Sequence, residues 1–471
     1  MNNHDTYDAA VIGGGSLGCF TARNLTRYQI STVLIEAASD VCTGITRANS
    51  SVVYPGYDHE PGSLKAEMTT RANRNMENLC RELEVPFSRP GSLMTAFGPK
   101  GDRTLQKKLD KGKRNGLAGL ELISGAEARS IEPMLGEGIT SALWCPSTGT
   151  VNPWQLGIAA FENAVNNGCT AHLNTKVLNI RRDGKRYVIE TDGGSISVRM
   201  VLNCAGLYAD QVRELLFSPL IRIRQDASDF LILDKHTCKP EHILFQETEE
   251  KGKGITAVPC AEGNLLLESA CRPMGAVPFA SDPDSLQVLR EQAHAYLPGL
   301  NLGAVIRNFA AARPNPYYIK EEAGRLVQEE KNIKSFVIDR PEPGFISLIG
   351  IKTPGLTCAQ ELGKMLAEQT ADYLEAAINP AFDPHRKAIL KPAELDFAER
   401  CRLVREKPEY GEIVCQCEEI TKGEILEAVQ RGITDPKGIR RRLGTGMGSC
   451  QGSRCMRQVE KIVKGAVHGK I

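Results

Sequence analysis

The chain has 471 residues, of which 41% are hydrophobic and 24% charged, and its formal net charge is +1. This length suffices for about three domain-sized units with buried cores, and the composition excludes wholesale disorder. The near-neutral charge gives no indication of nucleic acid as a partner. The sequence shows no apolar run of about 18 residues and no leader with a charged start and an apolar core, so we expect no transmembrane segment and a cytoplasmic location.

The first predicted element is a strand over residues 7–12 that runs directly into Gly13, Gly15 and Gly18. This G-x-G-x-x-G spacing, followed by a helix that can continue through residues 21–27, predicts a dinucleotide-binding turn. The first glycine allows the turn, the second lets the backbone approach a pyrophosphate, and the third lets helix and strand pack closely. The N–H groups at the start of the helix would then face the phosphates.

A second predicted strand, residues 31–35, ends in Glu36. An acid about 20 residues after the glycines can accept the ribose hydroxyls of an adenosine moiety. Strand, glycine spacing and acid therefore agree on a dinucleotide cofactor. This unit alone does not decide between FAD and NAD(P).

The next elements are predicted to lie around the ligand and on the surface. Residues 42–58 are small and polar and predict a loop close to a bound ligand. A helix is expected over residues 64–83, with Leu64 among its buried side chains. The Lys- and Arg-rich residues 100–114 predict a helix with a solvated face.

A further helix is expected over residues 150–167, with Asn152 as N-cap and Pro153 at the first helical position. Residues 171–181 then predict one strand. The short apolar runs between residues 221 and 316, separated by Gly and Pro turns, predict an antiparallel sheet. Such a sheet is suited to form the wall of a substrate chamber.

Three segments together, residues 7–36, 201–210 and 349–357, resemble the FAD-binding signatures of the D-amino-acid oxidase superfamily. Residues 47–58 are similar to the flavin-side loop of its glycerol-3-phosphate and L-2-hydroxyglutarate dehydrogenase branch. The resemblance covers roughly residues 5–380. It implies an α/β fold, in which a Rossmann-like FAD-binding domain carries an inserted antiparallel-sheet substrate domain.

The resemblance implies FAD as the cofactor, held by small residues and backbone of several loops. By motif, the residues along FAD would be Gly13, Gly15, Ser16, Leu17, Glu36, Asn49, Ser50, Val177, Ala205, Gly206, Gly350, Gly355, Leu356 and Thr357. Gly13, Gly15, Ser16 and Glu36 would hold the ADP half. Val177 would meet the adenine through its backbone, and the last four would face the pyrimidine edge of the flavin.

The resemblance also implies three catalytic residues. Arg313 lies where the superfamily places an arginine that clamps the substrate's carboxylate or phosphate. Lys352 is expected to stabilise the anionic reduced flavin, and Tyr54 to line the substrate face. A structural arginine, an exposed loop lysine and a packing tyrosine are the competing interpretations. The branch usually has His-Ala-Gly where this chain has Tyr-Pro-Gly at residues 54–56, so the motif lacks a general base, and His59 is the nearest candidate by sequence.

Near the C-terminus, two loops carry four cysteines, and four thiolates can hold a metal centre. These are Cys415, Cys417, Cys450 and Cys455. Two helices are expected between them, one with a capping box of Thr421 and Glu424 and one starting at Asp435 and Pro436. Spacing alone leaves iron and zinc open. The module, over about residues 412–463, resembles the bacterioferritin-associated ferredoxin type of [2Fe-2S] domain, which implies a small helical iron-sulfur domain.

We therefore expect three parts. An FAD-dependent oxidoreductase domain would cover residues 1–384, with FAD-binding parts at about 1–85, 145–220 and 340–384 and substrate parts at about 86–144 and 221–339. A linker at residues 385–411 would lead to the [2Fe-2S]-binding domain at residues 412–471.

The resemblance implies an FAD-dependent dehydrogenase that oxidises a small anionic substrate, glycerol 3-phosphate or a 2-hydroxy acid. Electrons would pass through the [2Fe-2S] cluster to a quinone or a partner redox protein. Binding to such a partner would place the chain at the periphery of the membrane. One alternative is an amine or imino-acid dehydrogenase of the opine or hydroxyproline type, which needs no alcohol base. The other is an electron-transfer subunit of a larger hetero-oligomer.

Overall fold

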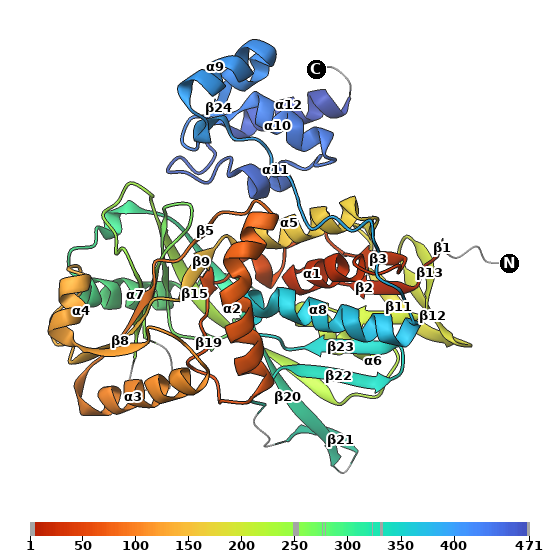
Figure 1. Cartoon of the computed structure of the whole chain (residues 1–471), viewed down its shortest axis with the longest axis horizontal. Coiled ribbons are helices and arrows are strands. Elements are labelled where there is room, and N and C mark those ends of the chain that lie inside the picture. Colours follow the sequence, from red (N-terminus) through yellow and green to blue (C-terminus); the bar gives the residue numbers. More distant parts are fainter. Residues whose placement is uncertain are drawn as a thin grey trace. The chain divides into compact units, whose positions relative to one another are not determined.

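The computed structural model describes residues 5–247, 254–275, 277, 279–322, 324–329 and 333–468. Figure 1 labels the helices and strands and colours them from red at the N-terminus to blue at the C-terminus. The chain forms two compact units. The first holds residues 1–303 and 308–386, and the second holds residues 387–471 together with 304–307.

A six-stranded sheet lies at the centre of the first unit (Figure 1). In spatial order its strands are β10 (Thr170–His172), β3 (Thr32–Ile35), β2 (Ala9–Ile12), β14 (Met200–Asn203), β23 (Phe345–Ile349) and β22 (Val337–Glu342). The first five pair in parallel, and β22 pairs antiparallel with β23. Strand β2 is fully buried between β3 and β14. In such sheets, ligands bind outside the carboxyl ends of the parallel strands.

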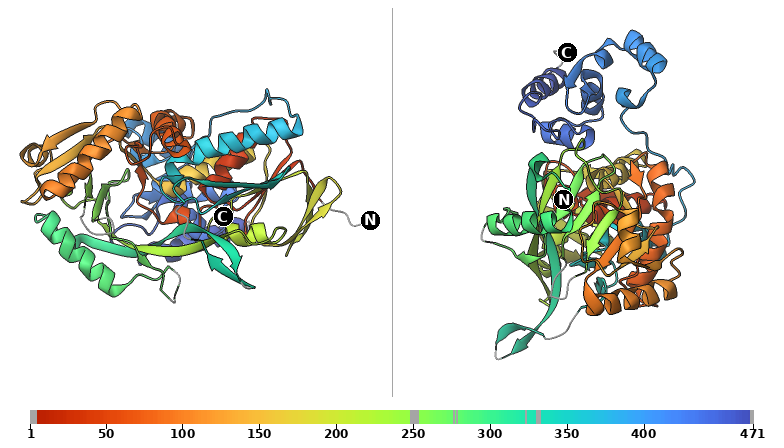
Figure 2. Two further views of the ribbon diagram at one scale, coloured as in Figure 1. Left: turned by 90° about the horizontal axis from the view of Figure 1, so that it is seen from below. Right: turned by 90° about the vertical axis from the view of Figure 1, so that its left-hand side faces the viewer.

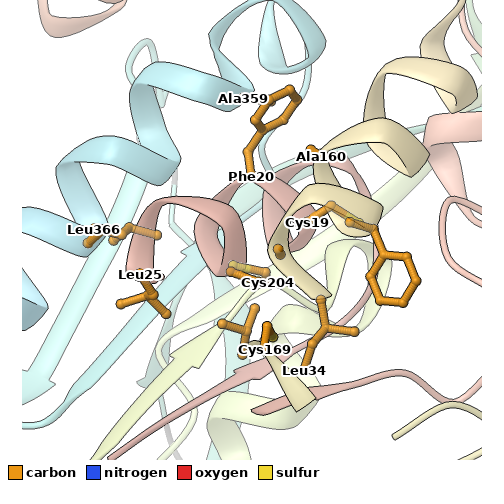
Figure 3. Packing of buried hydrophobic residues seen from close by; sticks show 14 of the residues in the cluster. Cys19, Phe20, Leu25, Leu34, Ala160, Cys169, Cys204, Ala359 and Leu366 are labelled. Carbon is orange, nitrogen blue, oxygen red and sulfur yellow. The ribbon is translucent and has the colours of Figure 1, made fainter. Parts of the chain in front are cut away.

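Helices cover this sheet, and α1 (Ser16–Leu25) packs against both α5 (Pro153–Asn166) and α8 (Gly355–Leu374). Figure 3 shows part of the resulting core, with Phe20 of α1 beside Ala359 of α8. The two helices approach closely because α8 has a glycine at the crossing. A Cβ on Gly363 would lie 2.7 Å from the carbonyl oxygen of Phe20. Helix α2 (Leu64–Glu82) also packs on α8.

A four-stranded sheet is formed by β1 (Asp5–Thr6), β13 (Gly194–Val198), β12 (Arg186–Thr191) and β11 (Val177–Asp183). The prediction of one strand over residues 171–181 is wrong, because β10 and β11 belong to different sheets. Between them Asn174 adopts φ +52° and Thr175 N donates to the carbonyl of Glu36. This turn takes the chain from the central sheet into the smaller one.

The substrate part is a ten-stranded sheet, and all pairings described in it are antiparallel except that of β16 with β6. In spatial order the strands are β21 (Arg325–Gln328), β20 (Val305–Glu322), β15 (Ile221–Leu233), β18 (Leu265–Glu268), β17 (Thr256–Pro259), β16 (Ile243–Gln246), β6 (Ser92–Ala96), β8 (Ser141–Cys145) and β7 (Glu121–Ser124), with β19 (Arg272–Pro273) beside β15. Figure 2 shows the two helices that lie along this part, α3 and α7. They cover residues Gly98–Arg114 and Pro283–Tyr296.

Three short strands, β4 (Val52–Val53), β9 (Gly149–Val151) and β5 (Phe87–Ser88), form a further small sheet. Helices α4 (Gly125–Ile131) and α6 (Ala209–Glu214) complete the first unit. The predicted Asn152 cap of α5 is confirmed, since its side chain accepts from Gln155 N. The prediction that Leu64 is buried is wrong. As the first residue of α2 it remains 37% exposed.

The second unit contains a two-stranded sheet, β24 (Ile413–Cys415) with β25 (Ile420–Thr421), and helices α9 (Phe397–Glu406), α10 (Lys422–Gln430), α11 (Pro436–Leu443) and α12 (Met456–Val467). The predicted capping box is confirmed, because Glu424 N donates to Thr421 Oγ1 and Thr421 N donates to Glu424 Oε2. The start of α11 at Pro436 with Asp435 as N-cap is also confirmed. Ile425, Ile439 and Val459 join these helices in one core.

Candidate active site

A cavity of about 560 Å³ opens at the carboxyl ends of the central parallel strands, and its volume is in the range of small-molecule sites. Gly13 follows β2, Glu36 follows β3 and Ala205 follows β14, and all three line the cavity. The lining continues to Glu268 and Arg313 of the ten-stranded sheet. The cavity therefore joins the dinucleotide-type turn to the predicted substrate chamber.

The three glycines of the first turn lie in different structural environments, so a side chain would have a different effect at each. Gly13 has φ +102°, and a Cβ there would lie 2.6 Å from the carbonyl oxygen of Cys204. A Cβ on Gly18 would lie 1.8 Å from the carbonyl oxygen of Gly13. Gly15, in contrast, has φ −72°, and the nearest atom to its Cβ would be Thr46 Oγ1 at 3.5 Å. Because the protein itself would accept a side chain at residue 15, the open space there fits close approach by a cofactor.

The N-terminus of α1 is suited to an anion. Gly15 is its N-cap, no side chain caps the helix, and the first turn contains no acidic residue. Ser16 and Leu17 of this turn line the cavity, and Ser16 N donates to Thr46 Oγ1 at 3.0 Å. The positive end of the helix dipole favours a phosphate at this position. The turn thus fits the pyrophosphate of FAD.

The carboxylate of Glu36 is held by backbone donors. Gly14 N donates to Oε2 at 2.6 Å, and Ala38 N donates to Oε1 at 2.8 Å. Each carboxylate oxygen retains a second acceptor position. The fixed carboxylate therefore fits the ribose hydroxyls of an adenosine moiety.

The cavity brings most of the predicted cofactor residues together. Those in its lining are Gly13, Gly15, Ser16, Leu17, Glu36, Asn49, Ser50, Ala205, Gly206, Gly355, Leu356 and Thr357. Val177 and Gly350 are not among the lining residues. Val177 lies on β11 and packs against the hydrophobic core between the central six-stranded sheet and the four-stranded sheet. Gly350 has φ +63°, and a Cβ there would lie 2.6 Å from the ring of Pro316.

Two predicted catalytic cations line the other part of the cavity. Lys352 Nζ donates to Asn315 Oδ1 at 2.6 Å, and Asn315 Nδ2 donates to Asp226 Oδ2 at 2.7 Å. Burial, and next the charge of Arg313, lower the pKa of Lys352. The lysine is therefore held in place by an amide that a carboxylate fixes in turn.

The Arg313 guanidinium lies beside a carboxylate. Its Nη2 is 3.8 Å from Glu268 Oε1. Burial acts to lower the pKa of Arg313, but the neighbouring Cys271 and Glu268 outweigh it and the pKa is raised. Arg313 therefore stays a cation in the cavity and can bind an anionic group.

Tyr54 also lines the cavity, with its backbone N–H donating to Thr357 Oγ1 at 3.0 Å and its ring stacked on Phe245 at 6.2 Å between centroids. His59 is not in the lining, and burial lowers its pKa to about 4. No histidine of the described residues lines the cavity. The structure thus adds no histidine to replace the one that the motif lacks.

Sequence reasoning missed the charged lining residue Glu268. Glu268 is the last residue of β18 and is 5% exposed. The available signal was a carboxylate directly after an apolar strand, residues 265–267. A buried charged side chain at the end of a core strand is costly unless it is paired, and so indicates a site.

The four C-terminal cysteines lie in two pairs within the second unit. The Cys415 thiol interacts with that of Cys455, and the Cys417 thiol with that of Cys450. Among the described residues, no three or more His, Cys, Asp or Glu side chains gather closely enough to hold one metal ion. Two pairs of thiols are the donor set of a two-iron cluster, in which each iron takes two cysteine ligands.

Backbone N–H groups of the glycine-rich loop point at these sulfurs. The amides of Gly452 and Arg454 hydrogen-bond to Cys450 and lower its pKa to about 7. Burial, and next the neighbouring Cys415, raise the pKa of Cys455 to about 11. Amide donors at sulfur favour thiolates, so this loop fits a thiolate-ligated cluster.

None of the helices in the described part of the chain combines the length and the apolar character needed to span a bilayer.

Comparisons with known proteins identify a family for each of the two parts of the chain. Residues 8–369 match the family described as FAD dependent oxidoreductase, and residues 413–464 match the BFD-like [2Fe-2S] binding domain. A protein of Caloramator mitchellensis named glycerol 3-phosphate dehydrogenase is 33% identical over 464 residues, 97% of this chain and 94% of the relative. The mitochondrial L-2-hydroxyglutarate dehydrogenase of Arabidopsis thaliana is 24% identical and covers 78% of this chain and 83% of its own length.

The fold is shared with solved flavoproteins. The L-alpha-glycerophosphate oxidase of Mycoplasma pneumoniae, solved with FAD bound, has a TM-score of 0.71 at 22% identity and covers 81% of this chain and 98% of its own. The resemblance drawn from the sequence, its α/β fold class and both cofactors are confirmed. The chain therefore belongs to the FAD dependent oxidoreductase family, with FAD as its flavin cofactor and a BFD-like [2Fe-2S] binding domain at residues 413–464.

Proposed function

We propose that this enzyme is a dehydrogenase that oxidises a small anionic alcohol, glycerol 3-phosphate or a 2-hydroxy acid. The carrying observation is that Arg313 and Lys352 line the same cavity as the glycine turn at Gly15. A cavity with a pyrophosphate-type turn in one part and two cations in another suits a flavin dinucleotide with an anionic substrate. The relative of Caloramator mitchellensis, named glycerol 3-phosphate dehydrogenase, supports this substrate class.

The residues of the cavity have separate tasks in this proposal. Arg313 binds the substrate's carboxylate or phosphate through its planar fork and so orients the carbon that is oxidised. Lys352, fixed by Asn315, supplies positive charge where the reduced flavin becomes anionic. Tyr54 covers the substrate face and helps exclude water. FAD, when bound, supplies the acceptor for the substrate's hydride.

We further propose ligands and an electron path for the second cofactor. Cys415, Cys417, Cys450 and Cys455 hold the [2Fe-2S] cluster as thiolates. A flavin takes two electrons at once, whereas the cluster carries one at a time. The cluster would therefore split the pair and pass single electrons to a quinone or a partner redox protein, with the chain as one member of a hetero-oligomer.

A specific observation favours a second candidate, the oxidation of a secondary amine or imino acid. No histidine of the described residues lines the cavity, and the carboxylate of Glu268 lies 3.8 Å from Arg313. A carboxylate beside a guanidinium matches a substrate that carries an ammonium beside a carboxylate. Such a substrate does not need the histidine base of an alcohol dehydrogenase.

Anaerobic bleaching of the flavin band distinguishes these candidates. The purified holoenzyme is mixed with glycerol 3-phosphate, L-2-hydroxyglutarate, lactate, proline and hydroxyproline, each in the absence of oxygen. Our proposal expects bleaching by a hydroxy compound. Bleaching by the secondary amino acids alone would establish the second candidate, and no bleaching by any compound would favour an electron-transfer subunit.

A further inference from the structure

The carboxylate of Glu268 combines burial with an incomplete set of hydrogen bonds. The residue is 5% exposed and lines the cavity. Its Oε1 faces Arg313 at 3.8 Å, which is an ion-pair distance but too long for a hydrogen bond. Its Oε2 is buried and has no hydrogen-bond partner among the described residues. A buried carboxylate oxygen without a donor is costly, and because this one belongs to a residue that lines the cavity, a bound ligand can supply the donor.

The oxidation needs an acceptor for one proton, and the lining offers few. Glu36 is the other carboxylate in the lining, and backbone N–H groups already donate to both of its oxygens. Lys352 is a donor to Asn315. Tyr54 carries a phenol, whose neutral O–H is a weaker proton acceptor than a carboxylate. Among the described lining residues, Glu268 alone has a buried carboxylate oxygen to which no protein group donates.

We propose that Glu268 is the general base of the reaction, an inference that rests on the proposed function. As the substrate's C–H hydrogen leaves with its electron pair, as hydride, for the flavin, the O–H bond breaks and its proton passes to Glu268 Oε2. The C–O bond becomes C=O, the flavin gains two electrons, and the carboxyl group later releases its proton to solvent. Arg313, which holds the substrate's anionic group, lies beside this carboxylate and so brings the hydroxyl to it.

The pH dependence of this proton transfer is set by Glu268 and by the charged groups around it. The charged and titratable groups around the pair are Arg313 and Lys352 as cations, Asp226 as a carboxylate, and Tyr54 and Cys271. Only an ionised carboxylate accepts the proton. The rate of flavin reduction should therefore fall as the pH is lowered.

The test compares Glu268→Gln with the wild-type holoenzyme, using whichever of glycerol 3-phosphate and L-2-hydroxyglutarate bleaches it. The flavin reduction rate at saturating substrate is followed by anaerobic stopped flow from about pH 8 to about pH 5. We expect a decrease of about 100-fold or more in the variant and loss of the acid-side fall in rate. Binding of the matching analogue without the reactive hydroxyl, propane-1,3-diol monophosphate or glutarate, should change less than about threefold.

Glu214→Gln is the matched control. Glu214 also pairs with an arginine, Arg222, and has a buried oxygen without a partner in the described part, but it is outside the lining. Substitution of Glu214 should leave the rate of flavin reduction within about twofold of the wild-type rate. A Glu268→Gln variant with a wild-type rate and pH profile would overturn the role of Glu268. If the variant bound the analogue more weakly but kept the wild-type pH profile, the role as general base would also be overturned, and Glu268 would have a structural role instead. Wild-type enzyme that neither compound bleaches would overturn the proposed function and, with it, this proton transfer.

Discussion

Lys352 donates a hydrogen bond of 2.6 Å to the side-chain oxygen of Asn315. Asn315 is itself oriented by Asp226, which accepts from its amide nitrogen at 2.7 Å. A free lysine side chain would lose about 2 kcal/mol of rotamer entropy on being fixed. The amide therefore sets the position of the ammonium before any ligand binds.

If Lys352 stabilises the anionic reduced flavin, Lys352→Met should lower the flavin reduction potential. Loss of one charged contact corresponds to about 30–60 mV for a two-electron couple. Spectroelectrochemical titration of the flavin band measures this shift. Lys364→Met, at an exposed lysine of α8 whose side chain is 56% accessible, should leave the potential unchanged. An equal potential in wild type and Lys352→Met would exclude the proposed role.

The same pair of proteins gives a pH prediction. Burial and Arg313 lower the pKa of Lys352 from its ordinary 10.5. The ammonium is present below that lowered pKa and is lost as the pH rises through it. The difference in flavin reduction potential between wild type and Lys352→Met should therefore be largest near neutral pH. It should disappear as the pH rises, and at a lower pH than it would if Lys352 had the pKa of an exposed lysine. Potentials recorded across the alkaline range show whether the difference disappears.

Arg313→Ala should impair every anionic substrate. Loss of a charge-assisted contact costs about 2 kcal/mol, which is about 30-fold in kcat/KM. Arg313→Lys keeps the charge but not the planar fork and should recover part of this loss. Arg340, an exposed arginine of β22, is the control position for Ala. Values of kcat/KM within about twofold of wild type in Arg313→Ala would contradict the clamp.

Gly15 and Gly18 give a matched pair of substitutions. A Cβ at Gly15 meets only Thr46 Oγ1 at 3.5 Å, whereas a Cβ at Gly18 lies 1.8 Å from the carbonyl oxygen of Gly13. Gly15→Ala should therefore give folded protein that retains less FAD, and Gly18→Ala should lower the melting temperature of the apoprotein itself. Flavin absorbance after gel filtration and thermal unfolding of the apoprotein separate the two effects. Full FAD retention by Gly15→Ala would show that the cofactor does not approach this residue.

The sequence predicts those parts of the site that local chemistry determines. The spacing of Gly13, Gly15 and Gly18 and the acid Glu36 need only a strand, a turn and a helix start, and the structure brings Gly13, Gly15 and Glu36 together in one cavity. Helix caps at Asn152 and Thr421 depend on residues three positions apart and were also predicted correctly.

The features that the sequence did not predict depend on contacts between segments that are distant in the chain. The strand predicted over residues 171–181 divides at Asn174 because β10 pairs with β3, and no local pattern indicates that pairing. Helix α7 was missed although Asp282 caps it, because its neighbours are rich in Gly and Pro. Glu268 and Arg313 are far apart in sequence, and only the folded ten-stranded sheet brings them within 3.8 Å.

The proposed cluster ligands can be tested without reference to turnover. In Cys450→Ser, the hydroxyl is a far poorer iron ligand than the thiolate, which here is favoured by amides of Gly452 and Arg454. The variant should lose the visible absorbance and the iron content of the [2Fe-2S] cluster and keep its flavin. Cys358→Ser is the control, because this buried cysteine of α8 contacts Thr69 and lies outside the module. Since a two-iron cluster needs all four sulfurs, full iron content in Cys450→Ser would require a different fourth ligand and would reopen the assignment of Cys415, Cys417 and Cys455 as well.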